Sequence, residues 1–364
     1  SNSTIAVKCN AIDTNSHKET GTFRHTLNIE NNIITTEEGA GITAYDDAIV
    51  VARDNVISGA GESSGFGIRS STVEIHNNVI GPIGGWNGLW IYGTSDVIAE
   101  NNTIQDTAKE AVLIGEYHFN DQGWNVPTPT AARLYLANNQ ISNNTGTCNS
   151  QMYDGDFACP AIHVFMSSAT LYDNTIVNNG GDGFRIKGGI VNAQRNTVEV
   201  GAFAANISMY DDNYGTKYGS IGYFSGNSYS NATQVYNITE SRVTVQSEYM
   251  PDPGAGELYP VNLQWLGAEC PYVLDECLQV PTTAALPPAF MPMALEVVDN
   301  STVFSFADLQ NFDASKVHVQ NQNSAWGSQV REGELVRYQV KAQNNNVADA
   351  TVVISDATGL PLYT

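Results

Sequence analysis

The chain has 364 residues, of which 16 are basic and 38 are acidic, so its formal net charge at pH 7 is −22. A surface this acidic repels nucleic acid and anionic membranes, and neither is expected as a partner. Hydrophobic residues make up 42 % of the chain, ample for a core, whereas charged residues make up only 15 %, which is more typical of an extracellular than of a cytosolic protein.

A short phrase recurs after the first 24 residues, which are themselves expected to form an N-terminal cap or an irregular first rung. Each copy has the form Asn-Asn-x-Ile or a close variant, and its successive asparagines are separated by 23, 23, 24, 37, 35, 22 and 31 residues. A base period of 22–24 residues with enlarged members is typical of a solenoid whose insertions lie in loops. The repeated residues are Asn32, Asn55, Asn78, Asn102, Asn139, Asn174, Asn196 and Asn227.

Each repeat contains three short runs with the period of a β-strand and none with the period of a helix. Three strands per turn, stacked one strand spacing apart, describe a parallel β-helix. Asparagine suits the corners because it tolerates left-handed backbone geometry, and stacked amides can hydrogen-bond along the coil. Residues 25–250 therefore resemble the right-handed parallel β-helix, pectin-lyase-like superfamily, in which many members hold polysaccharide chains on one face.

The pattern changes after residue 250. Residues 251–296 contain eight prolines and are predicted to be a linker, and the apolar stretch 284–295 carries three of these prolines and cannot span a bilayer. Residues 297–364 contain well-spaced strands without the asparagine repeat, and 348–363 resemble the end of an immunoglobulin-like module of surface proteins. We expect this module to be truncated, so the predicted fold class is all-β: a β-helix followed by an immunoglobulin-like sandwich.

The five cysteines suggest two local disulfides. Cys148 and Cys159 bracket one inserted loop, Cys270 and Cys277 bracket a short turn, and Cys9 is left over. Disulfides of this kind belong to an oxidising compartment, and reduced thiols are the alternative. Seven Asn-x-Ser/Thr sequons add weak candidates for glycosylation. Together these features predict a secreted or cell-surface glycoprotein.

Strand alternation in the second strand of each rung predicts which side chains face outward. The expected first column is Thr43, Arg69, Trp90, Leu113, His163, Arg185 and Asn206, and the second is Tyr92, Phe165, Lys187 and Ser208. The two largest insertions, 115–131 and 143–160, flank this strand and could form the walls of a groove.

These columns predict a carbohydrate-binding face. Aromatic rings pack against the apolar faces of sugar rings, and cationic side chains bind carboxylate or sulfate groups. The alternative is that the same side chains merely cover the sheet or pack beneath loops. The predicted binding residues are Arg69, Trp90, Tyr92, His163, Phe165, Arg185 and Lys187.

A lyase acting on acidic polysaccharide is a second hypothesis. Such an enzyme needs a base and a cation that stabilises the anion, with His163, Arg185 or Lys187 as the candidate base. Acid groups or metal-ligand oxygens would come from Glu116, Asp154 or Asp156. The string Arg185-Ile186-Lys187 is similar to one in polygalacturonase-like hydrolases, but the Gly-His-Gly and Asn-Thr-Asp motifs of that family are missing.

The binding hypothesis requires no cofactor, and calcium is the candidate cation for the lyase. Asp154 and Asp156 lie in one loop, and Asp211 and Asp212 begin a stretch like a calcium loop that lacks its final glutamate; a solvated turn is the alternative for each. A third hypothesis is a structural surface or filament subunit, which self-associates and needs no groove.

Overall fold

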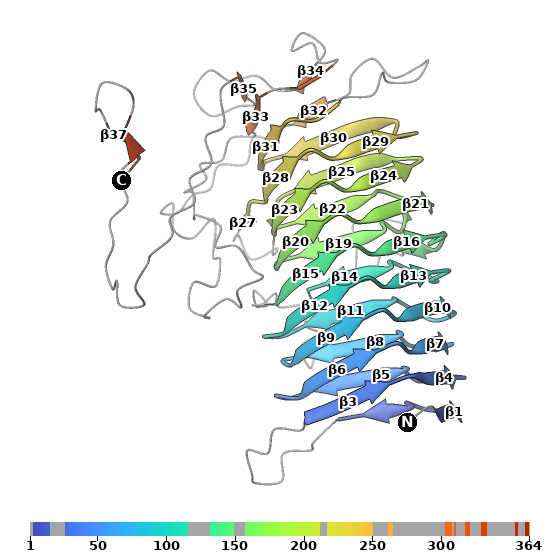
Figure 1. Cartoon of the computed structure of the whole chain (residues 1–364). Helices are drawn as coiled ribbons and strands as arrows, with labels where there is room; N and C mark the ends of the chain where they lie inside the picture. Colours follow the sequence, from blue (N-terminus) through green and yellow to red (C-terminus); the bar gives the residue numbers. More distant parts are fainter. Residues whose placement is uncertain are drawn as a thin grey trace. The chain divides into compact units, whose positions relative to one another are not determined.

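A computed structural model of the chain describes residues 3–14, 26–115, 132–148, 157–211, 217–249, 261–264, 303–307, 309–310, 317–320, 329–332, 354–355 and 361–363. Two units, residues 1–333 and 334–364, are described separately. Within the first unit the chain passes in turn through three parallel sheets, and successive strands of each sheet stack rung upon rung (Figure 1). This arrangement is the parallel β-helix that the repeat predicts.

The first sheet carries the asparagine repeat at the start of its strands. It contains β1 (Ser3–Val7), β4 (Asn32–Thr36), β7 (Val56–Gly59), β10 (Val79–Ile83), β13 (Thr103–Gln105), β16 (Gln140–Ser142), β21 (Thr175–Asn179), β24 (Thr197–Val200) and β29 (Ser228–Ser230).

The second sheet carries the outward columns that the sequence singles out. It contains β2 (Ile12–Asp13), β5 (Ile42–Tyr45), β8 (Phe66–Arg69), β11 (Leu89–Tyr92), β14 (Val112–Ile114), β19 (Ile162–Phe165), β22 (Phe184–Lys187), β25 (Phe203–Ser208), β30 (Gln234–Thr239), β32 (Val261–Gln264) and β34 (Val317–Gln320).

The third sheet closes each turn. It contains β3 (Thr26–Glu30), β6 (Ile49–Arg53), β9 (Thr72–His76), β12 (Asp96–Glu100), β15 (Arg133–Ala137), β20 (Ser168–Tyr172), β23 (Ile190–Gln194), β28 (Ile221–Ser225), β31 (Arg242–Gln246), β33 (Val303–Ala307) and β35 (Gln329–Glu332). Three antiparallel pairs lie outside these sheets: β17 (Thr147–Cys148) with β18 (Phe157–Ala158), β26 (Tyr210–Asp211) with β27 (Lys217–Tyr218), and β36 (Ile354–Ser355) with β37 (Pro361–Tyr363).

The two residues of each repeated asparagine pair have different structural roles. The first residue of each pair turns the corner in the left-handed region, with φ between 53° and 64° from Asn31 to Gly226. The second residue is buried, and its amide nitrogen donates to the amide oxygen of the next asparagine at 2.9–3.1 Å in every step from Asn32 to Asn227. The predicted amide stack is therefore confirmed, and the corner belongs to the preceding residue.

A glutamate ends this asparagine ladder. Asn227 donates to the Glu248 carboxyl group from its backbone nitrogen at 3.3 Å and from its side chain at 2.6 Å. The hydroxyls of Tyr229 and Tyr236 donate to the same carboxyl group at 3.2 and 2.6 Å. Burial raises the pKa of Glu248 to about 7, although these hydrogen bonds lower it.

The inward side chains of the three sheets form one apolar core along the coil. Ile34, Ile42 and Val50 represent the three sheets in one rung, and each is completely buried. Because the side chains of a strand alternate, the residues between them face outward. Among the described residues, no helix is long and apolar enough to cross a membrane.

The N-terminal end of the coil matches one of the two expectations, and the C-terminal end extends beyond its expected boundary. β1 and β2 pair in parallel with β4 and β5, so the N-terminal segment supplies a first rung. At the other end, β32, β33, β34 and β35 extend the second and third sheets, so the coil continues beyond residue 250. Strands at 303–307 and 317–320, which the sequence assigned to the immunoglobulin-like module, thus belong to these sheets. That module stays a prediction, with β36 and β37 as the strands described in residues 334–364.

Candidate functional site

The outward columns of the second sheet follow the strand register. One column runs through Thr43, Gly67, Trp90, Leu113, His163, Arg185 and Asn206, and the other contains Tyr45, Arg69 and Tyr92 and, beyond the shorter strand β14, Phe165, Lys187 and Ser208. The alternating inward neighbours, such as Ile91 and Ile186, belong to the core. The side-chain directions expected from the sequence are therefore correct.

Arg69 lies in the second column, not in the first as predicted. The sequence offers two glycines, Gly65 and Gly67, as the small residue before this strand, and the structure uses Gly65. A Cβ at Gly65 would lie 2.8 Å from the oxygen of Gly88, and one at Gly41 would lie 2.8 Å from the oxygen of Gly65. This close approach to the next rung requires glycine at position 65. Arg69 therefore falls in the second outward column, on the same face of the sheet.

The middle rungs of these columns are covered. Both His163 and Phe165 are completely buried, and Leu113 is 8 % exposed. Phe165 packs edge-on against Tyr210, with ring centroids 4.8 Å apart, and joins Met166 in a small apolar cluster. The prediction that His163 and Phe165 line an open binding face is therefore wrong, because both side chains are completely buried and Tyr210 packs on Phe165.

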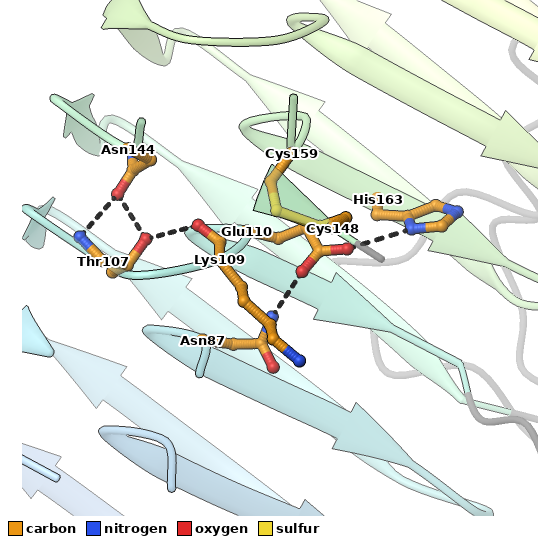
Figure 2. Close-up of a disulfide and its surroundings, with 8 residues drawn as sticks. All are labelled: Asn87, Thr107, Lys109, Glu110, Asn144, Cys148, Cys159 and His163. Atoms are coloured by element: carbon orange, nitrogen blue, oxygen red, sulfur yellow. Dashed lines mark hydrogen bonds and ion pairs between the residues drawn. A yellow bond between two sulfur atoms is a disulfide. The ribbon is translucent and has the colours of Figure 1, made fainter. Parts of the chain in front are cut away.

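A buried polar cluster lies beneath this cover, as Figure 2 shows. The Glu110 carboxyl group accepts a hydrogen bond from the Asn87 amide at 2.8 Å through one oxygen, and its other oxygen lies 3.4 Å from Nδ1 of His163. The disulfide between Cys148 and Cys159, which the sequence predicts, lies beside the same carboxyl group. Burial lowers the pKa of His163, although Glu110 acts in the opposite direction.

The lower rungs of the same face carry an aromatic strip, which we define as Tyr45, Trp86, Trp90 and Tyr92. Ring centroids are 5.1 Å apart between Trp86 and Trp90, 4.7 Å between Trp90 and Tyr92, and 6.2 Å between Tyr92 and Tyr45. Tyr92 is only 6 % exposed, whereas the other three rings are half-buried. The strip therefore offers continuous, partly open apolar surface.

A cation lies at each end of the aromatic strip. Nζ of Lys109 is 4.7 Å from the ring centroid of Trp86, and the guanidinium carbon of Arg69 is 4.8 Å from that of Tyr45. Arg69 also pairs with Asp46 at 2.9 Å, and this contact helps to raise the pKa of Arg69 against the effect of burial. Both cationic side chains therefore lie beside aromatic rings, a combination that suits ligands with anionic groups.

Arg185 and Lys187 lie higher on the coil, above the covered rungs. Lys187 places its Nζ 5.6 Å from the ring centroid of Tyr210, and both basic side chains are half-buried. Asp182 precedes this strand, and burial raises its pKa although Arg185 lowers it. Its carboxyl group accepts hydrogen bonds from the Asn206 amide and the Phe203 backbone.

Several predicted residues lie outside the described residues. They are Glu116, Asp154, Asp156, Asp212, Cys270 and Cys277, and the insertions expected to form groove walls lie largely outside as well. Asp211 belongs to β26. Cys9 is an exposed free cysteine.

Four residues of this face were not predicted from the sequence: Tyr45, Trp86, Lys109 and Glu110. Tyr45 could have been found, because it stands two residues after Thr43 in the same strand. Trp86 and Lys109 lie in corresponding turns of neighbouring rungs, where the Lys109 backbone nitrogen donates to the Trp86 oxygen at 3.1 Å. The alternation of a strand does not extend into such turns, so it does not predict which way the side chains of Trp86 and Lys109 point.

Comparison with protein families matched residues 1–122 to a family described as "Right handed beta helix region". Comparison with curated proteins found no match, and comparison with solved structures found none either. The family match agrees with three parallel sheets that stack as a solenoid. The chain thus contains an all-β, right-handed parallel β-helix.

Proposed function

We propose that the protein binds a polysaccharide or glycan chain along the aromatic strip on the lower rungs of the second sheet. The observation that carries this proposal is the contact series from Lys109 through the four rings to Arg69. Sugar rings have apolar faces that pack on aromatic side chains, and a row of rings can hold several successive sugars.

The two cations point to an anionic glycan. In a chain with a net charge of −22, most of the surface repels a polyanion, so basic groups next to an apolar strip create a local preference. Arg69 offers a fork of donors to a carboxylate or sulfate group, and Lys109 offers a point charge. Uronic or sulfated polysaccharides are the ligand class that these groups favour.

The described residues favour binding over catalysis. His163, the candidate base with the most suitable ordinary pKa, is buried against Glu110 and cannot reach a polymer on the surface. Arg185 lies near Asp182, which is itself only 6 % exposed. Lyase activity is therefore the second candidate and is measured in the same experiment.

We place the protein outside the cell or on its surface. The Cys148–Cys159 disulfide supports an oxidising compartment. Three sequon residues, Asn101, Asn143 and Asn231, are exposed with left-handed backbone geometry, which supports their use as glycosylation sites. By contrast, Asn206 and Asn237 are half-buried and share an amide hydrogen bond of 3.1 Å.

The test is binding of the full chain to uronic, sulfated and neutral polysaccharides, with and without calcium, while ultraviolet absorbance reports unsaturated lyase products. Replacement of Trp90 by Ala removes the central ring and is expected to weaken binding about 10-fold or more. Trp86→Ala should act in the same direction.

Tyr172→Ala is the matched control. Tyr172 is also half-buried and lies 3.9 Å from the Arg195 guanidinium carbon, but it belongs to the third sheet. Its removal should leave binding unchanged. Equal binding by wild type and Trp90→Ala would refute the proposed site, and growing absorbance would establish the lyase function instead. Absence of binding to every glycan class would favour the structural-subunit hypothesis.

A further inference from the structure

The two cations of the aromatic strip lie on different rungs of the coil. Lys109 stands in the turn before β14, Arg69 ends β8, and β11 lies between these two strands in the second sheet. One rung corresponds to about 4.8 Å along the coil axis, so the two backbone positions are about 10 Å apart in this direction. The charged groups also contact different rings, Trp86 for Lys109 and Tyr45 for Arg69. We therefore expect each cation to bind a different anionic sugar.

The backbone around Lys109 is held in place by its neighbours. Its nitrogen donates to the Trp86 oxygen at 3.1 Å, and its oxygen accepts a hydrogen bond from the Thr107 hydroxyl at 2.8 Å. The Thr107 backbone nitrogen in turn donates to the amide oxygen of Asn144 at 3.2 Å (Figure 2). The turn therefore fixes the position from which the Lys109 side chain extends over Trp86.

Arg69 keeps donors for a ligand although it pairs with Asp46. The ion pair joins one terminal nitrogen of Arg69 to Asp46 at 2.9 Å, whereas a guanidinium has five N–H donors. The Arg69 side chain is 39 % exposed. It can therefore bind a carboxylate of a sugar that packs beside Tyr45.

The ring between the two cations has no charge beside it. In the described part of the chain, no cation lies over Trp90, whose ring contacts Trp86 and Tyr92. A carboxylate placed over Trp90 would lose water without gaining a charged partner, which is unfavourable. The net charge of −22 adds to this cost. A neutral sugar suits this position better than an acidic one.

The strip thus presents a cation, an uncharged ring and a second cation in this order. We propose that it selects acidic glycans in which acidic and neutral sugars alternate, in preference to homopolymers of acidic sugars. This inference rests on the proposed function and specifies its ligand. Acidic sugars bind beside Lys109 and Arg69, and the neutral sugar between them packs on Trp90. The glycan crosses the sheet diagonally, because Lys109 precedes its strand whereas Arg69 ends another.

The two disfavoured ligand classes fail for different reasons. A homopolymer of acidic sugars reaches both cations but also places a carboxylate over Trp90. A neutral glycan packs on the rings but gains nothing from Lys109 and Arg69. Only the alternating charge pattern satisfies all three positions.

The experiment is a calorimetric titration of the full chain with three hexasaccharides. The first is from hyaluronan, in which glucuronic acid alternates with N-acetylglucosamine; the second is hexagalacturonate, in which every sugar is acidic; the third is the neutral cellohexaose. The hyaluronan hexasaccharide is expected to bind at least about 10-fold more tightly than either of the others.

Two variants test the assignment of the charges. Lys109→Gln and Arg69→Gln should each weaken binding of the hyaluronan hexasaccharide about 10-fold and leave the binding of cellohexaose unchanged. Lys8→Gln is the matched control, because Lys8 is an exposed lysine that pairs with Glu38 at 3.1 Å away from the strip. It should leave all three affinities unchanged. Circular dichroism shows whether each variant is folded.

The outcomes separate this inference from the proposed function. Hexagalacturonate or cellohexaose binding as tightly as the hyaluronan hexasaccharide, with weaker binding in Trp90→Ala, would overturn the inference and leave the glycan site in place. Hyaluronan binding that neither charge variant weakens would overturn the inference too. Failure of all three hexasaccharides to bind, or equal binding by wild type and Trp90→Ala, would refute the proposed function and the inference together.

Discussion

The lower and middle rungs of the second sheet have the same strand register but opposite surroundings. On β11 the outward Trp90 is half-buried and belongs to an aromatic strip, whereas on β19 the outward His163 and Phe165 are completely buried. The enlarged repeats occur around the middle rungs, where 37 and 35 residues separate successive asparagines. Strand alternation thus decides the direction of a side chain but not its exposure.

The largest effect is expected from removing a covered aromatic ring. Phe165→Ala leaves a cavity beneath the cover and should reduce the free energy of unfolding by about 3–5 kcal/mol. Trp90→Ala on the open rungs should cost less than about 1 kcal/mol. Urea unfolding followed by circular dichroism measures both, and equal losses would contradict the distinction between covered and open rungs.

Covered and open positions should differ for carboxyl groups as well, and the buried Glu248 should make the stability of the protein depend on pH. Its pKa is raised to about 7 in the folded protein from an ordinary value of 4.5, so the folded state binds more protons between these values. The contribution of Glu248 to the free energy of unfolding should therefore be fully present below about pH 4.5. It should be lost as the pH rises through about 7, by an amount on the order of 3 kcal/mol.

Glu248→Gln keeps the shape of the side chain and removes its charge. The variant should lose this part of the pH dependence and be the more stable protein above pH 7. Glu38→Gln is the control, because the Glu38 side chain is half exposed and pairs with Lys8 at the surface. Melting temperatures across the pH range measure the effect, and parallel curves for Glu248→Gln and wild type would refute it.

A smaller effect, on glycan affinity, is expected from a change at Gly67, which lies beneath Tyr45 of the aromatic strip. Tyr45 lies over Gly67, since a Cβ at Gly67 would approach the Tyr45 hydroxyl to 3.0 Å. Gly67→Val suits a strand but displaces this ring, so glycan binding should weaken about 10-fold while the melting temperature changes little. Calorimetric titration with the preferred polysaccharide measures the change, and unaltered affinity would remove Tyr45 from the site.

The smallest effect concerns the charge at the end of the strip. Arg69 and Asp46 are partly exposed, so their ion pair should contribute less than about 1 kcal/mol to stability. Arg69→Gln should therefore unfold at nearly the wild-type temperature but bind an anionic polysaccharide more weakly, with no change for a neutral one. Loss of affinity for both classes would indicate a change in the aromatic rings instead.

Much of the fold could be predicted from the sequence because the repeat imposes one local requirement many times. Each of Asn32, Asn55 and Asn78 needs an identical neighbour one rung away, which only a stack of equal turns supplies. The end of the coil was harder to predict. Beyond Glu248 the repeat is absent, although β33 continues the third sheet in register with β31.

The sequence by itself determined the coil, the inward and outward faces of its strands, and the Cys148–Cys159 loop closure. Only the tertiary structure decided which outward residues are open and which polar groups meet. Glu110 precedes His163 by 53 residues, and the two lie together because adjacent rungs bring distant segments to one strand spacing. Burial depends on what packs over a strand, and strand periodicity contains no information about that cover.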